Sequence, residues 1–298
     1  MRLPWLFLQM PLALLALICL PVQAQFNLNK IFDTVKKVGE TAKTAADGSR
    51  EFSQDEEIAL GEGISSSFLG AAPLHPDDKL QGYVNRVGRW LASQTERSDL
   101  PWMFGVLETE TINAFALPGG KVFITYGLLV RLNNEAELAA VLAHEIAHVL
   151  KKHHLSAIQA NAGASVFSTI GKEAASQVIA RRGGDTYGLK SQFANAGVEL
   201  VKDGVFLRPL DRSLEFEADR IAVVVAARAG YDPYGMVSVL QILQGAKSED
   251  AGLSLFKTHP PPSERMDQLE KLGPVVLDRF AAQPQVEGRF RQAIIGNR

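Results

Sequence analysis

Apolar side chains recur at helical spacing over much of the chain. Every fourth residue from Leu60 to Phe68 is apolar, and a capping-box pair, Ser53 and Glu56, precedes this stretch. The pattern predicts a helix that begins directly after Ser53. Residues 77–94 also carry one apolar face, which predicts a second helix. Further helices are expected over residues 135–153, 212–229 and 233–245, and after the prolines at 260–262.

The apolar pattern changes in the stretch between the second and third of these helices. Two segments, residues 102–107 and 121–126, are rich in β-forming side chains, and residues 111–120 separate them. The run Pro-Gly-Gly at residues 118–120 predicts a tight turn. Together these patterns predict an α+β fold that is predominantly helical and contains a small β-sheet.

The helix expected over residues 135–153 is strongly apolar and well capped. Asn133 and Asn134 can cap its start, acidic residues occupy its first turn, and Lys151 and Lys152 lie near its end. This distribution of charge is the one that the helix dipole favours. The sequence therefore predicts a stable, largely buried helix here.

His144, Glu145 and His148 form an HExxH pattern inside this helix. Histidines four residues apart share one helix face, so both imidazoles can reach one metal ion, and Glu145 projects beside them. Polar groups on an apolar helix need partners, which a shared metal provides. The pattern predicts a zinc hydrolase in which Glu145 is the general base that activates water and then passes the proton to the leaving amine.

A third protein ligand is expected outside this helix, because a catalytic zinc usually has three. The helix predicted over residues 212–229 contains the sequence Glu-Phe-Glu-Ala-Asp, with glutamates at 215 and 217. Glu215 and Asp219 share one face of that helix. On spacing alone, either Glu215 or Glu217 could be the third ligand.

The first 24 residues differ from the rest of the chain. Arg2 is followed by an apolar run that ends in small residues, which predicts a cleaved secretory signal over residues 1–24. An uncleaved membrane anchor and lipidation of Cys19, the single cysteine, are the alternatives. A polar N-terminal arm is expected over residues 25–50.

The rest of the chain is expected to form one protease domain over residues 51–273. Residues 156–201 are rich in Ala, Gly and Ser, and we interpret them as a lid insertion. Residues 274–298 are expected to be a C-terminal tail, too short for a tetratricopeptide domain. The formal net charge of −2 argues against a nucleic-acid partner.

Three separated motifs resemble zinc metallopeptidase family forty-eight. They are the HExxH helix, the Glu-Phe-Glu-Ala-Asp sequence, and the segment Asn-Ala-Phe-Ala-Leu-Pro-Gly-Gly at residues 113–120. The family includes the HtpX, Oma and CAAX prenyl proteases, and the resemblance is strongest to its periplasmic branch of BepA and LoiP proteins. It implies a zincin-type, gluzincin-like metalloprotease with a small sheet beside the HExxH helix, and one Zn²⁺ ion per chain.

The resemblance also implies roles for residues of the Glu-Phe-Glu-Ala-Asp helix. Glu215 would be the third zinc ligand, and Glu217 would be structural. Asp219 would orient a zinc-binding histidine or donate a proton, which makes it a second catalytic candidate beside Glu145. Arg212 would support the site by pairing with a carboxylate.

The segment before the tight turn would be the active-site edge strand. Such a strand holds substrate backbone by β-strand addition and selects unfolded or partly folded segments. It comprises Asn113, Ala114, Phe115 and Ala116.

A fourth motif, HPxxxxR, begins at His259 and ends at Arg265. By resemblance, His259 can approach the zinc, either as a fourth ligand that blocks the open position or as a group that stabilises the oxyanion. The alternative is a loop histidine that caps the next helix. Arg265 is expected to support the site, whereas His153 and His154 are expected to be ordinary surface or helix-end residues.

These observations predict a zinc metalloendopeptidase of the bacterial cell envelope. Its expected substrates are misfolded or immature envelope proteins in unfolded or partly folded form, and its expected location is the periplasm, with peripheral association with the outer membrane or its assembly machinery. The alternative function is a periplasmic chaperone or assembly factor in which proteolysis is rare or latent.

Overall fold

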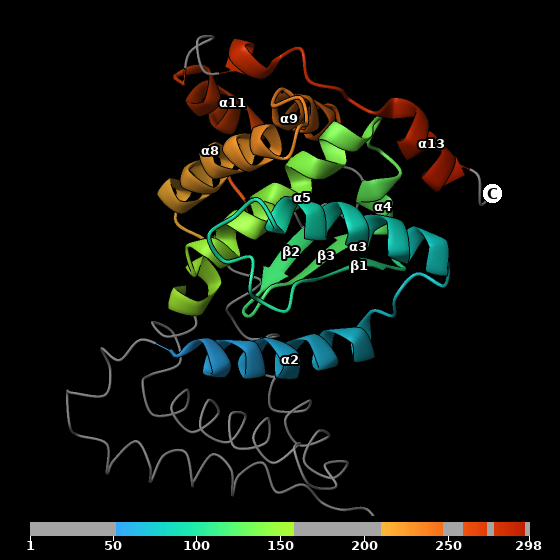
Figure 1. The fold of residues 1–298 in the computed structure, drawn as a ribbon, viewed down its shortest axis with the longest axis vertical. Coiled ribbons are helices and arrows are strands. Elements are labelled where there is room, and N and C mark those ends of the chain that lie inside the picture. Colours follow the sequence, from blue (N-terminus) through green and yellow to red (C-terminus); the bar gives the residue numbers. More distant parts are fainter. Residues whose placement is uncertain (1–51, 158–209, 247–258, 273–276, 296–298) are drawn as a thin grey trace, which may run out of the picture. The chain divides into compact units, whose positions relative to one another are not determined.

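A three-stranded sheet and the helices around it make up the described part of the chain (Figure 1). The computed structural model describes residues 52–157, 210–246, 259–272 and 277–295, all of which belong to one compact unit, residues 42–298. The predicted secretory signal and polar arm lie outside the described residues. So does the predicted lid, except for its first two residues.

The sheet has the strand order β1-β3-β2. Strand β1 (Met103–Leu107) pairs in parallel with β3 (Lys121–Thr125), and β2 (Ala114–Leu117) pairs antiparallel with β3. Gly119 (φ 72°) and Gly120 (φ 81°) make the turn between β2 and β3, where backbone with positive φ favours glycine. The predicted strands and turn are therefore confirmed, and β2 lies at an edge of the sheet.

The two faces of the sheet pack against different helices, because side chains alternate along each strand. One face faces α3 and α5 and joins the larger of two apolar clusters; it is formed by Phe104, Val106, Ala114, Ala116, Val122 and Ile124. The other face joins the smaller cluster with α2 residues and is formed by Leu107, Leu117 and Phe123. The sheet is thus buried on both faces.

Helices account for most of the described residues, as predicted. In the first half they are α2 (Gln54–Ala71), α3 (Asp78–Ala92), α4 (Tyr126–Leu129) and α5 (Glu135–Leu150). In the second half they are α8 (Arg212–Arg228), α9 (Gly235–Gly245), α11 (Pro262–Glu270), the short 3-10 helix η2 (Asp278–Phe280) and α13 (Glu287–Ile295). Within the segment assigned to the tail, Phe290 and Ile294 of α13 are buried in the larger core cluster.

Helix α5 lies between the sheet and a second set of helices (Figure 1). It packs against β2 and β3 on one side and against α8 and α9 on the other. At its start, Asn134 accepts a hydrogen bond from the Glu137 backbone at 2.9 Å, so the predicted cap is confirmed. The buried Glu135 carboxylate accepts hydrogen bonds from Tyr83, Tyr231 and Arg289, which tie α5 to α3, the α8–α9 connection and α13.

The end of α5 differs from the prediction. The helix was expected to continue to residue 153, but it ends at Leu150. Lys152 has φ 55°, a left-handed conformation that a right-handed helix cannot continue through, and helical geometry resumes only at His153. The chain therefore turns sharply between His148 and His153.

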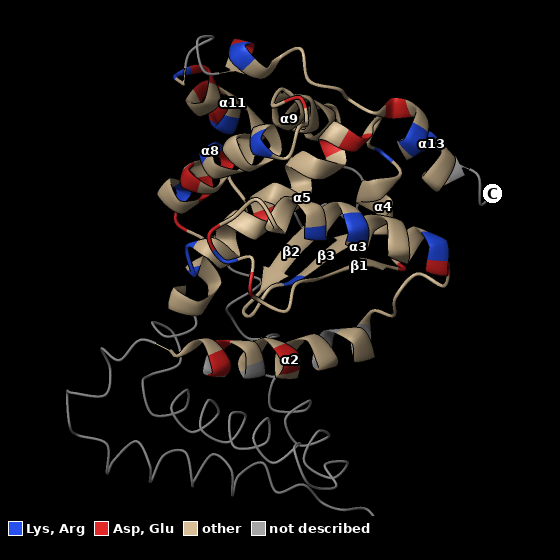
Figure 2. Ribbon diagram, in the orientation of Figure 1, with Lys and Arg blue, Asp and Glu red and all other residues tan. Residues whose placement is uncertain are grey.

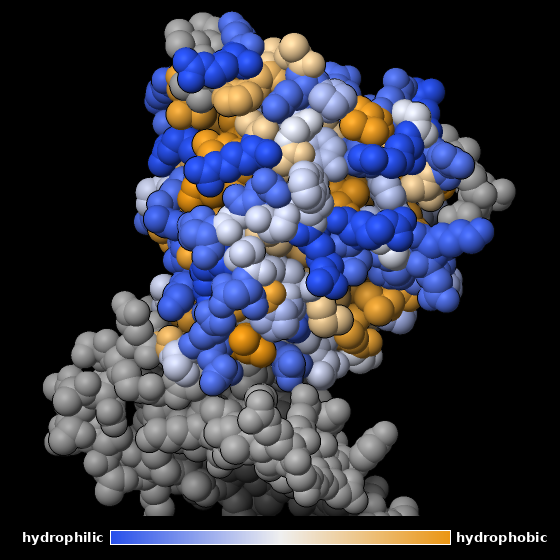
Figure 3. All heavy atoms as spheres, in the orientation of Figure 1, coloured by the Kyte–Doolittle hydropathy of each residue, from blue (hydrophilic) through white to orange (hydrophobic). Residues whose placement is uncertain are grey.

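Charged residues gather on the outer helices α8, α11 and α13, whereas the strands are almost free of them (Figure 2). The face drawn in Figure 3 is mostly hydrophilic with scattered apolar side chains. Among the helices of the described segments, none combines the length and the apolar character that a membrane crossing requires.

Candidate metal centre

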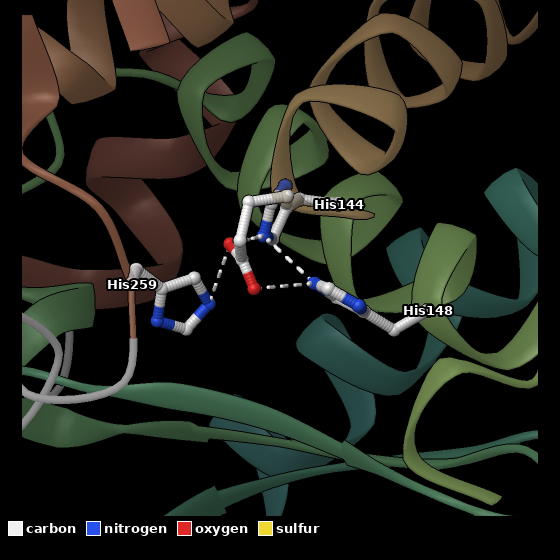
Figure 4. Close-up of side chains that lie close together, drawn as sticks. His144, His148 and His259 are labelled. Atoms are coloured by element: carbon white, nitrogen blue, oxygen red, sulfur yellow. Dashed lines mark hydrogen bonds and ion pairs between the residues drawn. The ribbon is translucent and has the colours of Figure 1, made fainter. Parts of the chain in front are cut away.

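Side chains from α5, α8 and the segment before α11 converge on one buried point. His144 and His148 come from α5, Glu215 from α8, and His259 from the residues just before α11. One ligand atom of each lies within 4.8 Å of the others. Figure 4 shows the three imidazoles arranged around a carboxylate. Predicted ligands 67 residues apart along the chain, His148 and Glu215, are thus brought together.

The ligand atoms of these groups lie close to one another. The Nε2 atoms of His144 and His148 are 3.1 Å apart. The Glu215 carboxylate oxygens lie 3.5 Å from the first and 3.6 Å from the second. Both oxygens are buried and have no hydrogen-bond partner among the described residues. A carboxylate buried in this way needs a cation or a donor.

A buried ion pair holds His144 from behind. Its Nδ1 atom lies 2.9 Å from Oδ1 of Asp219, and Arg265 donates to both Asp219 oxygens at 2.6 and 2.9 Å. Although burial opposes ionisation, Arg265 holds the pKa of Asp219 well below its usual range. Because a carboxylate only accepts, the proton of His144 is on Nδ1, and its Nε2 lone pair faces the centre.

A second chain of contacts holds His148. Its Nδ1 atom lies 3.0 Å from Nδ1 of His153, and the opposite nitrogen of His153, Nε2, lies 3.3 Å from Oε2 of Glu217. Lys151 pairs with the other Glu217 oxygen at 2.9 Å. The sequence reasoning missed this series of contacts. His153 was expected to be an ordinary surface or helix-end residue, but it is 4% exposed. The only sequence signal was a histidine close behind the HExxH pattern.

The donor set fits a metal cation. Two imidazole lone pairs and a carboxylate without a hydrogen-bond donor face one another, and nitrogen and carboxylate oxygen are common ligands of divalent metals. Burial lowers the pKa of His144, but Asp219 and Glu215 together raise it to about 9. The two carboxylates therefore stabilise a positive charge at this imidazole, which a proton supplies without a metal and a bound cation can supply in its place.

Glu145 lies beside this cluster and is 2% exposed. Burial raises the pKa of its carboxyl to about 7, and the nearby Glu215 charge contributes to the rise. A hydrogen bond from the Ala116 backbone opposes the rise and connects Glu145 to strand β2. A carboxyl with a pKa near neutrality can both accept and release a proton at neutral pH.

His259 closes the cluster on its remaining side. Its Nε2 atom lies 3.5 Å from Oε2 of Glu215, and its ring centre is 5.4 Å from that of His144. Burial lowers the pKa of His259 to about 4, so the imidazole is neutral and able to act as a ligand. With His259 included, the cluster offers four ligand atoms.

The remaining predicted residues fall into two groups. Ala114, Phe115 and Ala116 form the edge strand β2, and Asn113 precedes it. Arg212 does pair with a carboxylate, but its partner at 2.7 Å is Glu264, and both side chains are exposed. The Arg212–Glu264 pair therefore lies on the surface and outside the cluster.

Two histidines at helical spacing, a glutamate between them and a carboxylate from a second helix are the groups of a metal-dependent hydrolase. The family model of Peptidase family M48 matches residues 78–273, a segment that contains every member of the cluster. The chain belongs to that family.

Several curated proteins are similar to the chain. The beta-barrel assembly-enhancing protease of Yersinia pestis is 31% identical over 214 residues, which cover 71% of this chain and 43% of the relative. The protein of the same name from Escherichia coli (strain K12) is 29% identical over 268 residues, or 87% of this chain and 52% of the relative.

A mitochondrial relative is also similar. The mitochondrial metalloendopeptidase OMA1 of Schizosaccharomyces pombe is 33% identical over 190 residues, which cover 63% of this chain and 52% of the relative. The chain spans about half the length of the curated relatives it matches.

Proposed function

We propose that this chain is a zinc metalloendopeptidase in which His144, His148 and Glu215 hold the metal. The observation that carries the proposal is the meeting of two imidazole Nε2 atoms, 3.1 Å apart, with a buried carboxylate that lacks a hydrogen-bond donor among the described residues. Membership of a metallopeptidase family supports it. We infer that the arrangement of α5, the sheet and α8 is a zincin-type, gluzincin-like fold.

Zinc held at this point would supply Lewis-acid chemistry, which polarises a peptide carbonyl and acidifies water. Glu145 supplies the proton transfers. Its carboxylate, next to the cluster and joined to β2 through the Ala116 backbone, accepts a proton from the attacking water and gives it to the leaving amine. Asp219 orients His144 through Nδ1, so its part is to position a ligand rather than to donate a proton.

Strand β2 is the surface on which the peptide substrate binds. It is an edge strand, so one side of its backbone can pair with an extended peptide. The hydrogen bond from the Ala116 backbone connects Glu145, the proposed general base, to this strand. Only a segment that can become extended fits such a site, which favours unfolded or partly folded proteins as substrates.

His259 is a latch in this proposal. A catalytic zinc needs three protein ligands and one open position, whereas the cluster with His259 has four ligand atoms. His259 must therefore leave before substrate binds. His259→Ala should raise peptide cleavage; lower activity would indicate oxyanion stabilisation instead, and unchanged activity would indicate a loop residue with no part in the reaction.

The biological role is inferred from relatives that carry the name beta-barrel assembly-enhancing protease. We infer that the chain acts on unfolded or immature cell-envelope proteins in the periplasm, after removal of residues 1–24, and that it associates peripherally with the outer membrane or its assembly machinery. The closed, four-ligand cluster favours one alternative, an assembly factor whose proteolysis is latent.

The decisive variant is Glu145→Gln, which removes the general base and leaves the metal ligands in place. The purified full-length wild type and the variant are each measured for bound zinc and for cleavage of a denatured, fluorescently labelled protein. Both should bind the same amount of zinc. Cleavage by the variant should fall about 10²- to 10⁴-fold. Equal cleavage would overturn the mechanism. If Glu145→Gln repaired the envelope defects of cells that lack this protein as fully as the wild type does, that result would favour the assembly factor.

A further inference from the structure

The contacts behind His148 are unlike those behind His144, although both imidazoles face the same centre. Asp219 contacts His144 directly, whereas a second imidazole, that of His153, contacts His148 at 3.0 Å. His153 is not part of the HExxH pattern, and it lies on the far side of His148 from Glu215. Its position therefore calls for a separate explanation.

The direction of the proton between the two imidazoles follows from their other contacts. If His148 is a ligand through Nε2, its single proton lies on Nδ1 and must be donated. His153 can accept it at Nδ1 only when its own proton is on Nε2. The Glu217 carboxylate, 3.3 Å from that Nε2, stabilises the required tautomer because it can only accept.

The opposite arrangement is incompatible with a metal site. A proton on Nδ1 of His153 would oblige His148 to accept there and to carry its proton on Nε2. That Nε2–H would then point at Nε2 of His144, 3.1 Å away, and no lone pair of His148 would face the centre. Glu217 thus selects the one tautomer pair that leaves His148 free to bind metal.

The local backbone brings His153 into this position. Helix α5 ends at Leu150, and the left-handed backbone of Lys152 changes the direction of the chain. The next residue, His153, therefore lies against Nδ1 of His148. Lys151, in the same turn, pairs with Glu217 at 2.9 Å and fixes the carboxylate against His153. A continued helix would separate these side chains.

We propose that His153 and Glu217 are positioning residues that fix the tautomer and ring orientation of the metal ligand His148. This inference rests on the proposed zinc site. Outer partners of metal-bound histidines commonly contribute about 10- to 100-fold to metal affinity or activity, because they orient the ring and raise its basicity. The pair therefore tunes how tightly the metal is held.

The test is zinc affinity of the full-length protein, measured by competition with a chromophoric chelator. His153→Ala should weaken zinc binding by about 10- to 100-fold. His153→Asn keeps an acceptor oxygen near the place of Nδ1 and should recover most of that loss. Glu217→Gln keeps its shape but loses its charge, and should weaken binding by up to about tenfold.

Glu264→Gln is the matched control. It removes a surface ion pair of similar exposure, that with Arg212, and should leave zinc affinity unchanged. A melting scan of each metal-free protein separates positioning from folding. A positioning role predicts equal melting temperatures without zinc and a smaller zinc-induced rise in the His153→Ala and Glu217→Gln variants.

Two results would overturn the inference: wild-type zinc affinity in both His153→Ala and Glu217→Gln, or no recovery in His153→Asn. Failure of the zinc site itself would look different. In that case His148→Ala would bind zinc as tightly as wild type, or wild type would bind none.

Discussion

The two histidines of the HExxH helix are held in place by supports of opposite character. The inner support, Asp219 and Arg265 behind His144, is buried: their side chains are 0% and 4% exposed. The outer support, His153, Glu217 and Lys151 behind His148, reaches the surface, where Glu217 is 33% and Lys151 44% exposed. One proposed ligand is thus held by the core and the other by a turn that solvent can reach.

This difference indicates separate tasks. A buried ion pair is costly to break, because the remaining charge has no partner and little water. A solvent-exposed pair is worth little by itself and is screened by salt. The inner support therefore contributes to folding as well as to the metal site, whereas the outer support can adjust metal affinity at small cost to stability.

The largest effect is expected from Arg265→Leu. The change leaves the Asp219 carboxylate buried and without its guanidinium partner, which should lower the free energy of unfolding by about 3–5 kcal/mol. Urea denaturation of metal-free protein would measure it. If Arg265→Leu lowered the free energy of unfolding no more than Lys151→Ala does, the two supports would not differ as proposed.

Asp219→Asn should have the next largest effect, on zinc binding. The amide oxygen can still accept from His144, but it lacks the charge that raises the basicity of that ring, so zinc affinity should fall by about 10- to 100-fold. Chelator competition is the measurement, with Glu217→Gln run beside it. A greater loss in Glu217→Gln than in Asp219→Asn would reverse the proposed order of the supports.

The turn at Lys152 offers a smaller and sharper test. A β-branched residue tolerates left-handed backbone poorly, so Lys152→Val should lower stability by about 1–2 kcal/mol and weaken zinc binding by displacing His153. Lys152→Gly, which accepts the same φ without strain, is the control and should bind zinc like wild type. Equal zinc affinity in both variants would disconnect the turn from the metal site.

Lys151→Ala should have the smallest effect. Its ion pair with Glu217 is exposed, and such pairs contribute about 0–1 kcal/mol. Unfolding measured at low and high salt should show that even this difference shrinks as salt rises. A loss of several kcal/mol, independent of salt, would mean that the outer support is part of the core.

Much of this arrangement is predictable from the sequence, because it depends on short-range periodicity. The four-residue spacing of His144 and His148 places them on one face, and the β-forming side chains of residues 102–107 and 121–126 predict two strands. Spacing alone left Glu215 and Glu217 open as the third ligand, and the family resemblance implied Glu215. Helix α8 presents Glu215 to α5, with no exposure, and turns Glu217 toward the surface.

The supports were harder to predict for two physical reasons. Supporting roles for Asp219 and Arg265 were expected from the resemblance, but their pairing was not. Arg265 reaches Asp219 only because α11 packs against α8, a contact between residues 46 positions apart that no local pattern encodes. His153 reaches His148 only because Lys152 adopts a backbone conformation that lysine rarely takes. A helix pattern continued through residue 153 predicts the wrong place for that imidazole.

The central claim is that His144, His148 and Glu215 hold a catalytic zinc. The most direct measurement is zinc bound per chain, by mass spectrometry after dialysis, in Glu215→Ala and in its near neighbour Glu217→Ala, with cleavage of a denatured protein measured on the same samples. The account predicts that Glu215→Ala loses the zinc and the activity, and that Glu217→Ala keeps most of both at saturating zinc. Tightly bound zinc and full activity in Glu215→Ala would contradict it.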